Sequence, residues 1–125
     1  MGEAKLPVLA DDVIEKRLKN ELPDWWYEEK SIRRQYKTDG WLSTLALVNA
    51  IGYVAEAAGH HPDLEVTWST LGVKLSTHSA KGITERDFAL ARKIDAAALW
   101  RPEPGSALDG TPSAWVRGAS PDKKA

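Results

Sequence analysis

Cysteine is absent from this 125-residue chain, which also contains only one methionine and one phenylalanine. The absence of thiols excludes disulfide bonds, thiolate zinc sites and a cysteine nucleophile. The N-terminal stretch MGEAKLPVLADD has no long apolar run of the kind that signal peptides contain. We therefore expect a protein of the reducing cytoplasm.

An excess of charge of one sign is absent as well. The 17 Lys and Arg residues face 18 Asp and Glu residues, and no basic stripe alternates with aromatic residues, so nucleic acid is not an expected partner. The most apolar stretch, residues 41–59, contains four polar residues, namely Ser43, Thr44, Asn49 and Glu56. We interpret it as a buried helix and not as a membrane span.

Apolar residues at helical spacing predict two helices in the first half of the chain. Residues 11–22 begin with acidic residues, with Asp12 as the candidate N-cap, and end before Pro23. Residues 41–59 form the predicted central helix, closed by Gly59. The inward face of this central helix is expected to hold Leu47, Ile51, Val54 and Ala58.

A third helix and two hairpins complete the predicted domain. Thr84 is the expected N-cap of a helix that reaches Trp100, with its inward face formed by Phe88, Ala91, Ile94 and Ala98. Residues 25–36 are interpreted as one hairpin. Apolar and polar residues alternate in residues 64–68 and 73–76, which are interpreted as the two strands of a second hairpin. Trp68 is more typical of a core residue than of a ligand platform.

The resulting order is α-β-β-α-β-β-α, which predicts an α+β fold with a four-stranded antiparallel sheet and helices packed on one face. Residues 1–100 would form this domain, and residues 101–125 a tail rich in Pro, Gly and Ser without apolar periodicity. In that tail Trp115 and Val116 either pin the segment to the body or to a partner, or are incidental.

All three histidines fall within nineteen residues, in the pattern E-x3-HHP-x5-W-x9-H-x8-D that runs from Glu56 to Asp87. Imidazoles titrate near neutral pH, so the cluster of His60, His61 and His78 is typical of proton transfer to a ligand. Asp87 lies three residues after Thr84 and is also suited to capping the helix start, a role compatible with one in a site.

A zinc site is the first alternative, because histidine and aspartate are metal ligands. Adjacent histidines project in different directions, whereas the common two-histidine helix motif places its ligands four residues apart, so the spacing disfavours zinc. No serine elbow, phosphate-binding glycine loop or dinucleotide fingerprint is present. Two interpretations remain, namely proton transfer on a small organic substrate and a ligand pocket without turnover.

The strings EAAGHHPDLEVTW, LSTH and GITERDFALA resemble the pterin-4a-carbinolamine dehydratase family over about residues 11–100. This resemblance implies dehydration of 4a-hydroxytetrahydropterins to quinonoid dihydropterins without a metal or cofactor. It also implies four catalytic residues, namely His60, His61, His78 and Asp87. The substrate-binding residues that it implies are Glu56, Pro62, Trp68 and Thr77.

Two departures from the usual dehydratase pattern change the surroundings of the histidines. Tyr36, Lys37 and Thr38 stand where the enzymes commonly have F-x-F, and Ser79 and Lys81 follow the TH pair where an acid and a small residue are usual. The long cation of Lys81 would fill or recharge the mouth of the pocket.

The longer string TDGWLSTLALVNAIGYVAEAAGHHPDLEVTW, with LARKID and LWRPEPG, is more similar to the dehydratase-like proteins of bacteria that build α-carboxysomes. That branch implies a RuBisCO assembly factor with weak or lost dehydratase activity, associated with carboxysomes, and we prefer it to an active dehydratase. RuBisCO subunits are then the expected partners, whereas an active enzyme would bind pterin. In either case we expect a homo-oligomer, first a dimer and alternatively a tetramer, because the sheet has free edges. A third family role, as a dimerisation cofactor of a homeodomain transcription factor, has no specific support in this chain.

Overall fold

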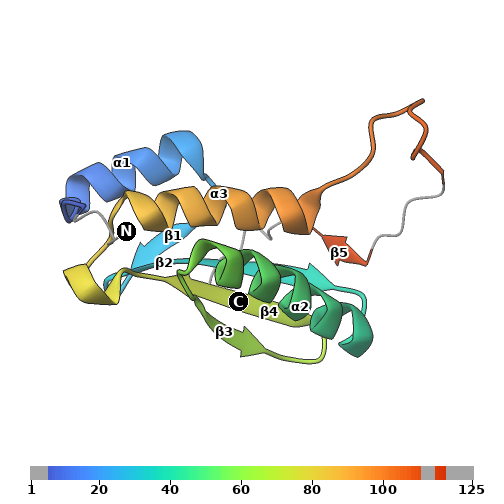
Figure 1. Ribbon diagram of the computed structural model, residues 1–125, viewed down its shortest axis with the longest axis horizontal. Coiled ribbons are helices and arrows are strands. Elements are labelled where there is room, and N and C mark those ends of the chain that lie inside the picture. The colour runs from blue at the N-terminus through green and yellow to red at the C-terminus, as the bar shows by residue number, and fades with distance from the viewer. Residues whose placement is uncertain (1–5, 111–114, 118–125) are drawn as a thin grey trace.

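The computed structural model describes residues 6–110 and 115–117 of the chain. The described residues form three α-helices and one antiparallel sheet, which confirms the predicted α+β class. Figure 1 shows the helices beside the sheet. The elements are α1 (Asp11–Glu21), β1 (Trp26–Glu28), β2 (Ser31–Thr38), α2 (Trp41–Ala58), β3 (Asp63–Val66), β4 (Thr70–Leu75), the short 3₁₀ helix η1 (His78–Ala80), α3 (Glu85–Leu99) and β5 (Val116–Arg117).

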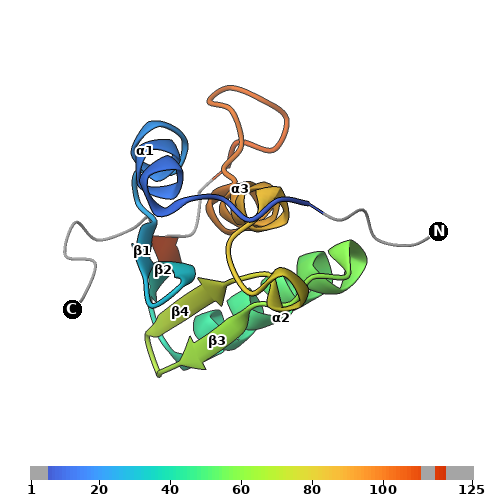
Figure 2. The ribbon, with the colours of Figure 1, turned by 90° about the vertical axis from the view of Figure 1, so that its left-hand side faces the viewer.

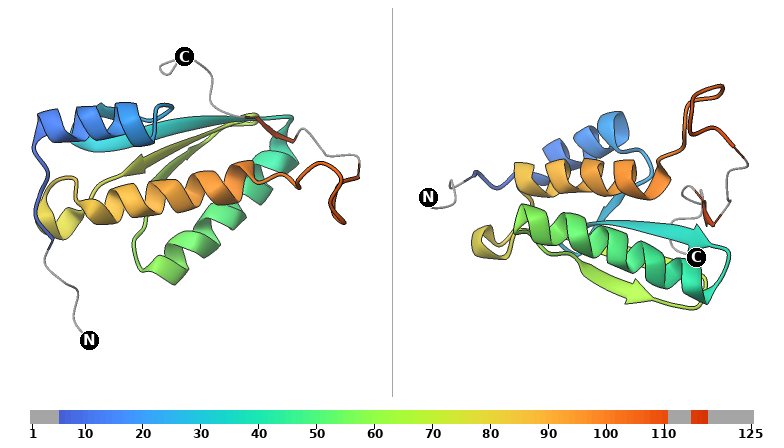
Figure 3. Two further views of the ribbon diagram at one scale, coloured as in Figure 1. Left: turned by 90° about the horizontal axis from the view of Figure 1, so that it is seen from above. Right: turned by 45° about the vertical axis from the view of Figure 1, so that its right-hand side comes forward.

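The sheet has the strand order β1-β2-β4-β3, and every pairing in it is antiparallel. The two predicted hairpins are therefore confirmed, and the long central pairing of β2 with β4 runs from Ile32↔Leu75 to Lys37↔Thr70. The helices cover one face of this sheet, with α3 between α1 and α2 (Figures 2 and 3).

Alternation along the strands separates the two faces of the sheet. Ile32 and Tyr36 of β2 and Leu71, Val73 and Leu75 of β4 are fully or almost fully buried beneath the helices. Arg34 also lies on the buried side, whereas the alternate residues of the two strands, such as Arg33 and Lys74, point to the face that carries no helix, as the period of two in a strand requires. The buried face and the inward sides of the three helices form one core.

The start of α1 differs from the sequence prediction. The N-cap is Ala10, which has no side chain able to cap, and its carbonyl accepts the amide of Ile14 at 2.9 Å. Asp12 was therefore wrongly predicted as the N-cap, since it lies inside the first turn with Asp11. Both carboxylates still favour this helix end, because the N-terminus of a helix carries partial positive charge.

The interpretation of α2 as a buried helix was also wrong. Only one face is buried, formed by Thr44, Leu47, Ile51 and Ala55, while Leu42 is 80% exposed and Tyr53 is 77% exposed. By length and composition α2 could cross a membrane, with a mean hydropathy of 1.2 over 18 residues. Leu47 and Ile51 lie in the core of the domain, however, as they do in the core helix of a globular fold.

The turn between β3 and β4 explains why Trp68 is not a core residue. The Thr67 amide donates to the Thr70 carbonyl at 3.0 Å, and the Thr67 hydroxyl accepts the Thr70 amide at 2.9 Å. These bonds end β3 at Val66 and place Trp68 in the turn, where it is 70% exposed. The expectation of a buried Trp68 was therefore wrong, because the turn interrupts the alternation.

The predicted tail contributes a strand that the sequence did not predict. Val116 and Arg117 pair with Thr38 and Lys37 as β5, and the Asp39 amide donates to the Trp115 carbonyl at 3.0 Å. Val116 is buried within the core, so these residues pin the segment to the body of the domain. Residues 111–114 and 118–125 of the tail lie outside the described residues.

Candidate functional site

The site is built where α2 ends beside the start of α3. Gly59 closes α2 with a left-handed backbone (φ 63°), which glycine adopts without strain, and its amide bonds to carbonyls of the last turn. This reversal takes the next residue, His60, out of the helix and toward α3. The His60 side chain is only 10% exposed.

Asp87 is the buried centre of the site. Thr84 caps α3 as predicted, and Asp87 completes the capping box by accepting the Thr84 amide at 2.9 Å. The same carboxylate accepts the Thr77 hydroxyl at 2.7 Å and lies 2.7 Å from Nε2 of His60. Asp87 has no exposed surface, so its structural and site roles coexist.

This arrangement fixes how the His60 ring presents its two nitrogens. A carboxylate can only accept, so Nε2 of His60 is the donor to Asp87 and Nδ1 carries the lone pair of the neutral ring. A histidine oriented by a buried carboxylate can take up a proton, because the negative charge stabilises the imidazolium that forms. The pair is therefore chemically suited to act as a general base.

His61 makes a separate pair on the surface. Its Nε2 lies 2.9 Å from Oε1 of Glu56, and the two side chains are 62% and 81% exposed. Glu56 was predicted as a substrate-binding residue, and here it contacts His61. Pro62, the next residue, is half-buried and immediately precedes β3.

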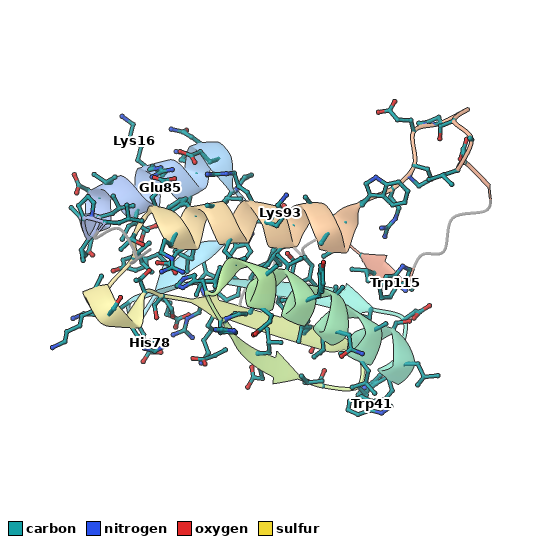
Figure 4. The ribbon with its side chains drawn as sticks, in the orientation of Figure 1. Lys16, Trp41, His78, Glu85, Lys93 and Trp115 are labelled. Atoms are coloured by element: carbon teal, nitrogen blue, oxygen red, sulfur yellow. The ribbon has the colours of Figure 1, made fainter. Side chains whose placement is uncertain are left out.

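His78 lies away from this pair, at the start of η1, where it is exposed. Figure 4 shows His78 at the η1 end of the molecule and Lys93 midway along α3. His60 lines a groove of about 530 Å³ between α2 and α3, together with Tyr53, Arg86 and Lys93, whereas His78 lines a different pocket. The structure thus brings His60, Asp87 and Thr77 into contact and leaves His61, His78 and the exposed Trp68 outside this network.

Two residues of the site were not predicted from the sequence. The Thr84 hydroxyl lies 2.9 Å from the Thr77 hydroxyl, so the cap of α3 also belongs to the network around Asp87. Arg86 lines the groove and donates to the Gly59 carbonyl at 3.1 Å, joining the two helix ends. The spacing T-x6-T-x2-D in the sequence is a signal that could have indicated the threonine network.

Within the described ranges, no group of three or more His, Cys, Asp and Glu side chains is arranged to hold a metal ion. His60 and Asp87 form a pair without a third ligand nearby, and His61 with Glu56 forms another. These contacts are those of hydrogen-bonded pairs and not of a coordination sphere.

Comparison with known proteins gives consistent results. Residues 7–97 match the family model described as pterin 4 alpha carbinolamine dehydratase. A protein of Aquifex aeolicus, provisionally named pterin-4-alpha-carbinolamine dehydratase, is 45% identical over 87 residues, which are 70% of this chain and 87% of the relative. A protein of Nocardia farcinica with the same provisional name is 43% identical over 73% of this chain and 95% of the relative.

Two solved structures are also similar. A transcriptional coactivator/pterin dehydratase from Brucella melitensis superposes with a TM-score of 0.68 and 28% identity, covering 74% of this chain and 99% of the other. A pterin dehydratase-like protein identified as a RuBisCO assembly factor in the α-carboxysome has a TM-score of 0.50 and 19% identity, over 59% of this chain and 86% of the other. At that identity the second likeness shows a common fold alone.

Proposed function

Because the chain belongs to the pterin-4a-carbinolamine dehydratase family, we propose that it catalyses the loss of water from a 4a-hydroxytetrahydropterin. The observation that carries this proposal is the 2.7 Å contact of His60 with the fully buried Asp87. The sequence alone favoured an assembly factor. We place the enzyme first because a buried carboxylate held by Thr77 and Thr84 orients a histidine for proton transfer.

The reaction needs two proton transfers and no change in oxidation state. The bond between C4a and its hydroxyl oxygen breaks, a proton joins that oxygen to give water, and a ring nitrogen loses a proton as the C=N bond of the quinonoid dihydropterin forms. We assign the removal of the nitrogen proton to Nδ1 of His60, since Asp87 stabilises the resulting imidazolium. His61 and His78 are the candidate donors to the leaving oxygen. No step requires an electron acceptor or a metal.

The test is the rate at which freshly generated 4a-hydroxytetrahydropterin loses water, followed by stopped-flow absorbance. We expect a rate above background that His60→Ala lowers by about 10²- to 10⁴-fold, the usual contribution of general acid–base catalysis. Lys16→Ala is the matched control, because Lys16 lies on the exposed side of α1, away from the site. A background rate from the folded protein would refute the proposal.

Comparison of His61→Ala with His78→Ala assigns the acid. The variant that loses activity with unchanged folding identifies the donor to the leaving oxygen. If neither variant differs from the unsubstituted enzyme, proton delivery by these histidines is wrong.

A second candidate function is the RuBisCO assembly factor that the longer sequence resemblance implies. The exposed apolar residues of α2 support it, because an assembly factor must hold its client on such a surface. Trp41 is 51% exposed, Leu42 80% and Tyr53 77%. In this case RuBisCO subunits would be the partners and the protein would be associated with carboxysomes.

The yield of soluble RuBisCO, co-expressed with and without this protein, tests the second function. Leu42→Asp should reduce the yield if α2 binds the client, whereas His60→Ala should leave it unchanged. An equal yield with and without the protein would exclude an assembly role and leave the dehydratase proposal untouched.

A further inference from the structure

The groove that contains His60 is elongated, because it follows two helices. The His60 side chain, just after α2, contacts Asp87 in the first turn of α3. From this junction the two helices run in roughly opposite directions (Figure 3), and each contributes one row of residues to the groove. Each row has the spacing of a single helix face and covers about two turns, so the groove extends about 10 Å from His60. The rows are Arg86, Ala89, Leu90 and Lys93 on α3 and Tyr53, Val54, Ala57 and Ala58 on α2.

The polarity of the lining changes along the groove. His60 and Arg86 form the polar end, where the proposed reaction takes place. Tyr53 lies seven residues before His60, and Lys93 lies seven residues after Arg86, so both belong to the far end. The walls between the two ends are apolar and carry small side chains, chiefly those of Ala57, Ala58 and Ala89. A molecule that fills the groove therefore meets a polar, an apolar and a polar region in turn.

The far end of the groove carries a cation without a counter-charge. Among the described residues that line the groove, none is acidic. Lys93 has no ion-pair partner across the described part of the chain, although its neighbour Arg92 is paired with Glu21 and Glu85. At the same end Tyr53 is 77% exposed, and its ring can pack against another ring. These features suit an aromatic group that ends in an anion.

Resting on the proposed dehydratase function, we propose that the pterin that reacts at His60 carries a substituent made of an aromatic ring that ends in a carboxylate. The ring would lie over the alanines and against Tyr53, and the carboxylate would pair with Lys93. The groove volume of about 530 Å³ lies in the usual range for a small-molecule site.

Two other kinds of substituent fit the groove less well. A short hydroxyalkyl chain would not reach Lys93, and it would place its hydroxyl groups against the apolar middle of the groove. A phosphate monoester would bring a charge of about −1.5 to −2 to an end that has one cation, whereas a single carboxylate matches that cation.

Binding of pterins that cannot react tests this inference without turnover. The probes are pteroate, its methyl ester and 6-methylpterin, each titrated into the full chain in a calorimeter. We expect pteroate to bind about tenfold or more tightly than 6-methylpterin, because pteroate also buries an aromatic ring. It should bind about 2- to 5-fold more tightly than its methyl ester, because only the free acid can pair with Lys93.

Substitution of Lys93 tests the position of the carboxylate. Lys93→Ala should remove the difference in affinity between pteroate and its ester, and Lys93→Arg should keep it. Lys16→Ala is the matched control, because Lys16 is an exposed lysine of α1, and it should also keep the difference. The inference fails if pteroate and 6-methylpterin bind equally, or if Lys93→Ala keeps the difference. Tighter binding of a pterin with a phosphate monoester in place of the benzoate would overturn the assignment to a carboxylate.

Failure of this inference can be distinguished from failure of the proposed function. The 4a-hydroxytetrahydro forms of pteroate and of 6-methylpterin are compared as substrates. If both lose water with the same kcat/KM, the dehydratase proposal stands and the inference about the substituent is wrong. If neither loses water above background while pteroate binds through Lys93, the dehydratase proposal is wrong and the groove remains a site for this class of ligand.

Discussion

Asp95 of α3 is the residue on which the polar groups of the core converge. It accepts Nε1 of Trp25 at 3.0 Å, Nη1 of Arg34 at 2.6 Å and the hydroxyl of Tyr36. Arg34 is 2% exposed, and its Nε and Nη2 atoms are buried without a hydrogen-bond partner. The charge of Arg34 is therefore balanced chiefly by one carboxylate.

Removal of that carboxylate should destabilise the fold strongly. We expect Asp95→Ala to lower the free energy of unfolding by about 3–5 kcal/mol, because it leaves a buried guanidinium uncompensated. Urea denaturation measures this loss. Asp24→Ala is the control, since Asp24 is exposed and lies 3.8 Å from Nη2 of Arg34, and it should cost less than about 1 kcal/mol. Equal effects of the two substitutions would contradict the role given to Asp95.

Tyr36 gives the core a response to alkaline pH. Burial, with the negative charge of Asp95 as the next cause, raises the pKa of the Tyr36 hydroxyl above its usual value of 10.0. The neutral Tyr36 hydroxyl therefore stabilises the folded state. Because the folded-state pKa lies above the unfolded value, this stabilisation is complete below about pH 10 and is lost as the pH rises further. We expect tyrosinate absorbance of Tyr36 to appear only as the protein unfolds, and Tyr36→Phe to remove that component. A Tyr36 that ionises in the folded protein would contradict this.

The candidate site was predictable from the sequence only in part. The alternation of side chains along a strand explains why His78 lies apart from the other predicted site residues. The pattern of histidines and acids indicated a site that includes His60 and Asp87, and the predicted cap of α3 is consistent with a buried Asp87. Thr77 continues the inward alternation of β4, so its neighbour His78 must point to the other face. The side of the sheet to which His78 points can therefore be predicted from the sequence, whereas the Thr77–Thr84 contact depends on tertiary packing.

At the level of helices and strands, the starts, ends and inward faces that depend on residues close together in the sequence could be predicted. The cap at Thr84, the stop at Gly59 and the inward face of α3 were all correct. The exposure of the outer face of α2 and the strand β5 were not predicted, because each depends on which neighbours the fold supplies. The turn at Trp68 was not predicted either, although local hydrogen bonds between Thr67 and Thr70 close it. The pairing of β5 with β2 has no periodic signal, since the strand is two residues long.

The contribution of β5 to stability can be measured with one substitution. Val116 is 1% exposed in the core, so Val116→Ala should lower the free energy of unfolding by about 1–3 kcal/mol through the loss of two buried methyl groups and the cavity that they leave. Leu108→Ala is the matched control in the same segment, because Leu108 is 72% exposed, and it should change stability by less than about 0.5 kcal/mol. If Val116→Ala has no effect on thermal or urea unfolding, β5 is not part of the stable core.

For the whole molecule, the exposed surface of α2 and the free edge of β3 lead us to expect self-association. Leu42 and Tyr53 lie on one exposed side of α2, and β3 is the last strand of the sheet order. Light scattering should give a mass that is a multiple of 13.8 kDa, first the dimer and alternatively the tetramer. Leu42→Asp should reduce that mass, whereas Leu108→Asp should not. A monomer at all accessible concentrations would contradict the expectation.

The strand β5 also has a consequence for how the folded molecule opens. Lys37 and Arg117 are about eighty residues apart along the chain, and the pairing that joins β5 to β2 is only two residues long. Such a contact can break while β2 and β4 stay paired, because its rupture costs less than global unfolding. The Asp39 amide, which is bound to the Trp115 carbonyl, should therefore exchange its hydrogen for deuterium well before the amides between β2 and β4 do. Its early exchange would report an opening of this segment alone.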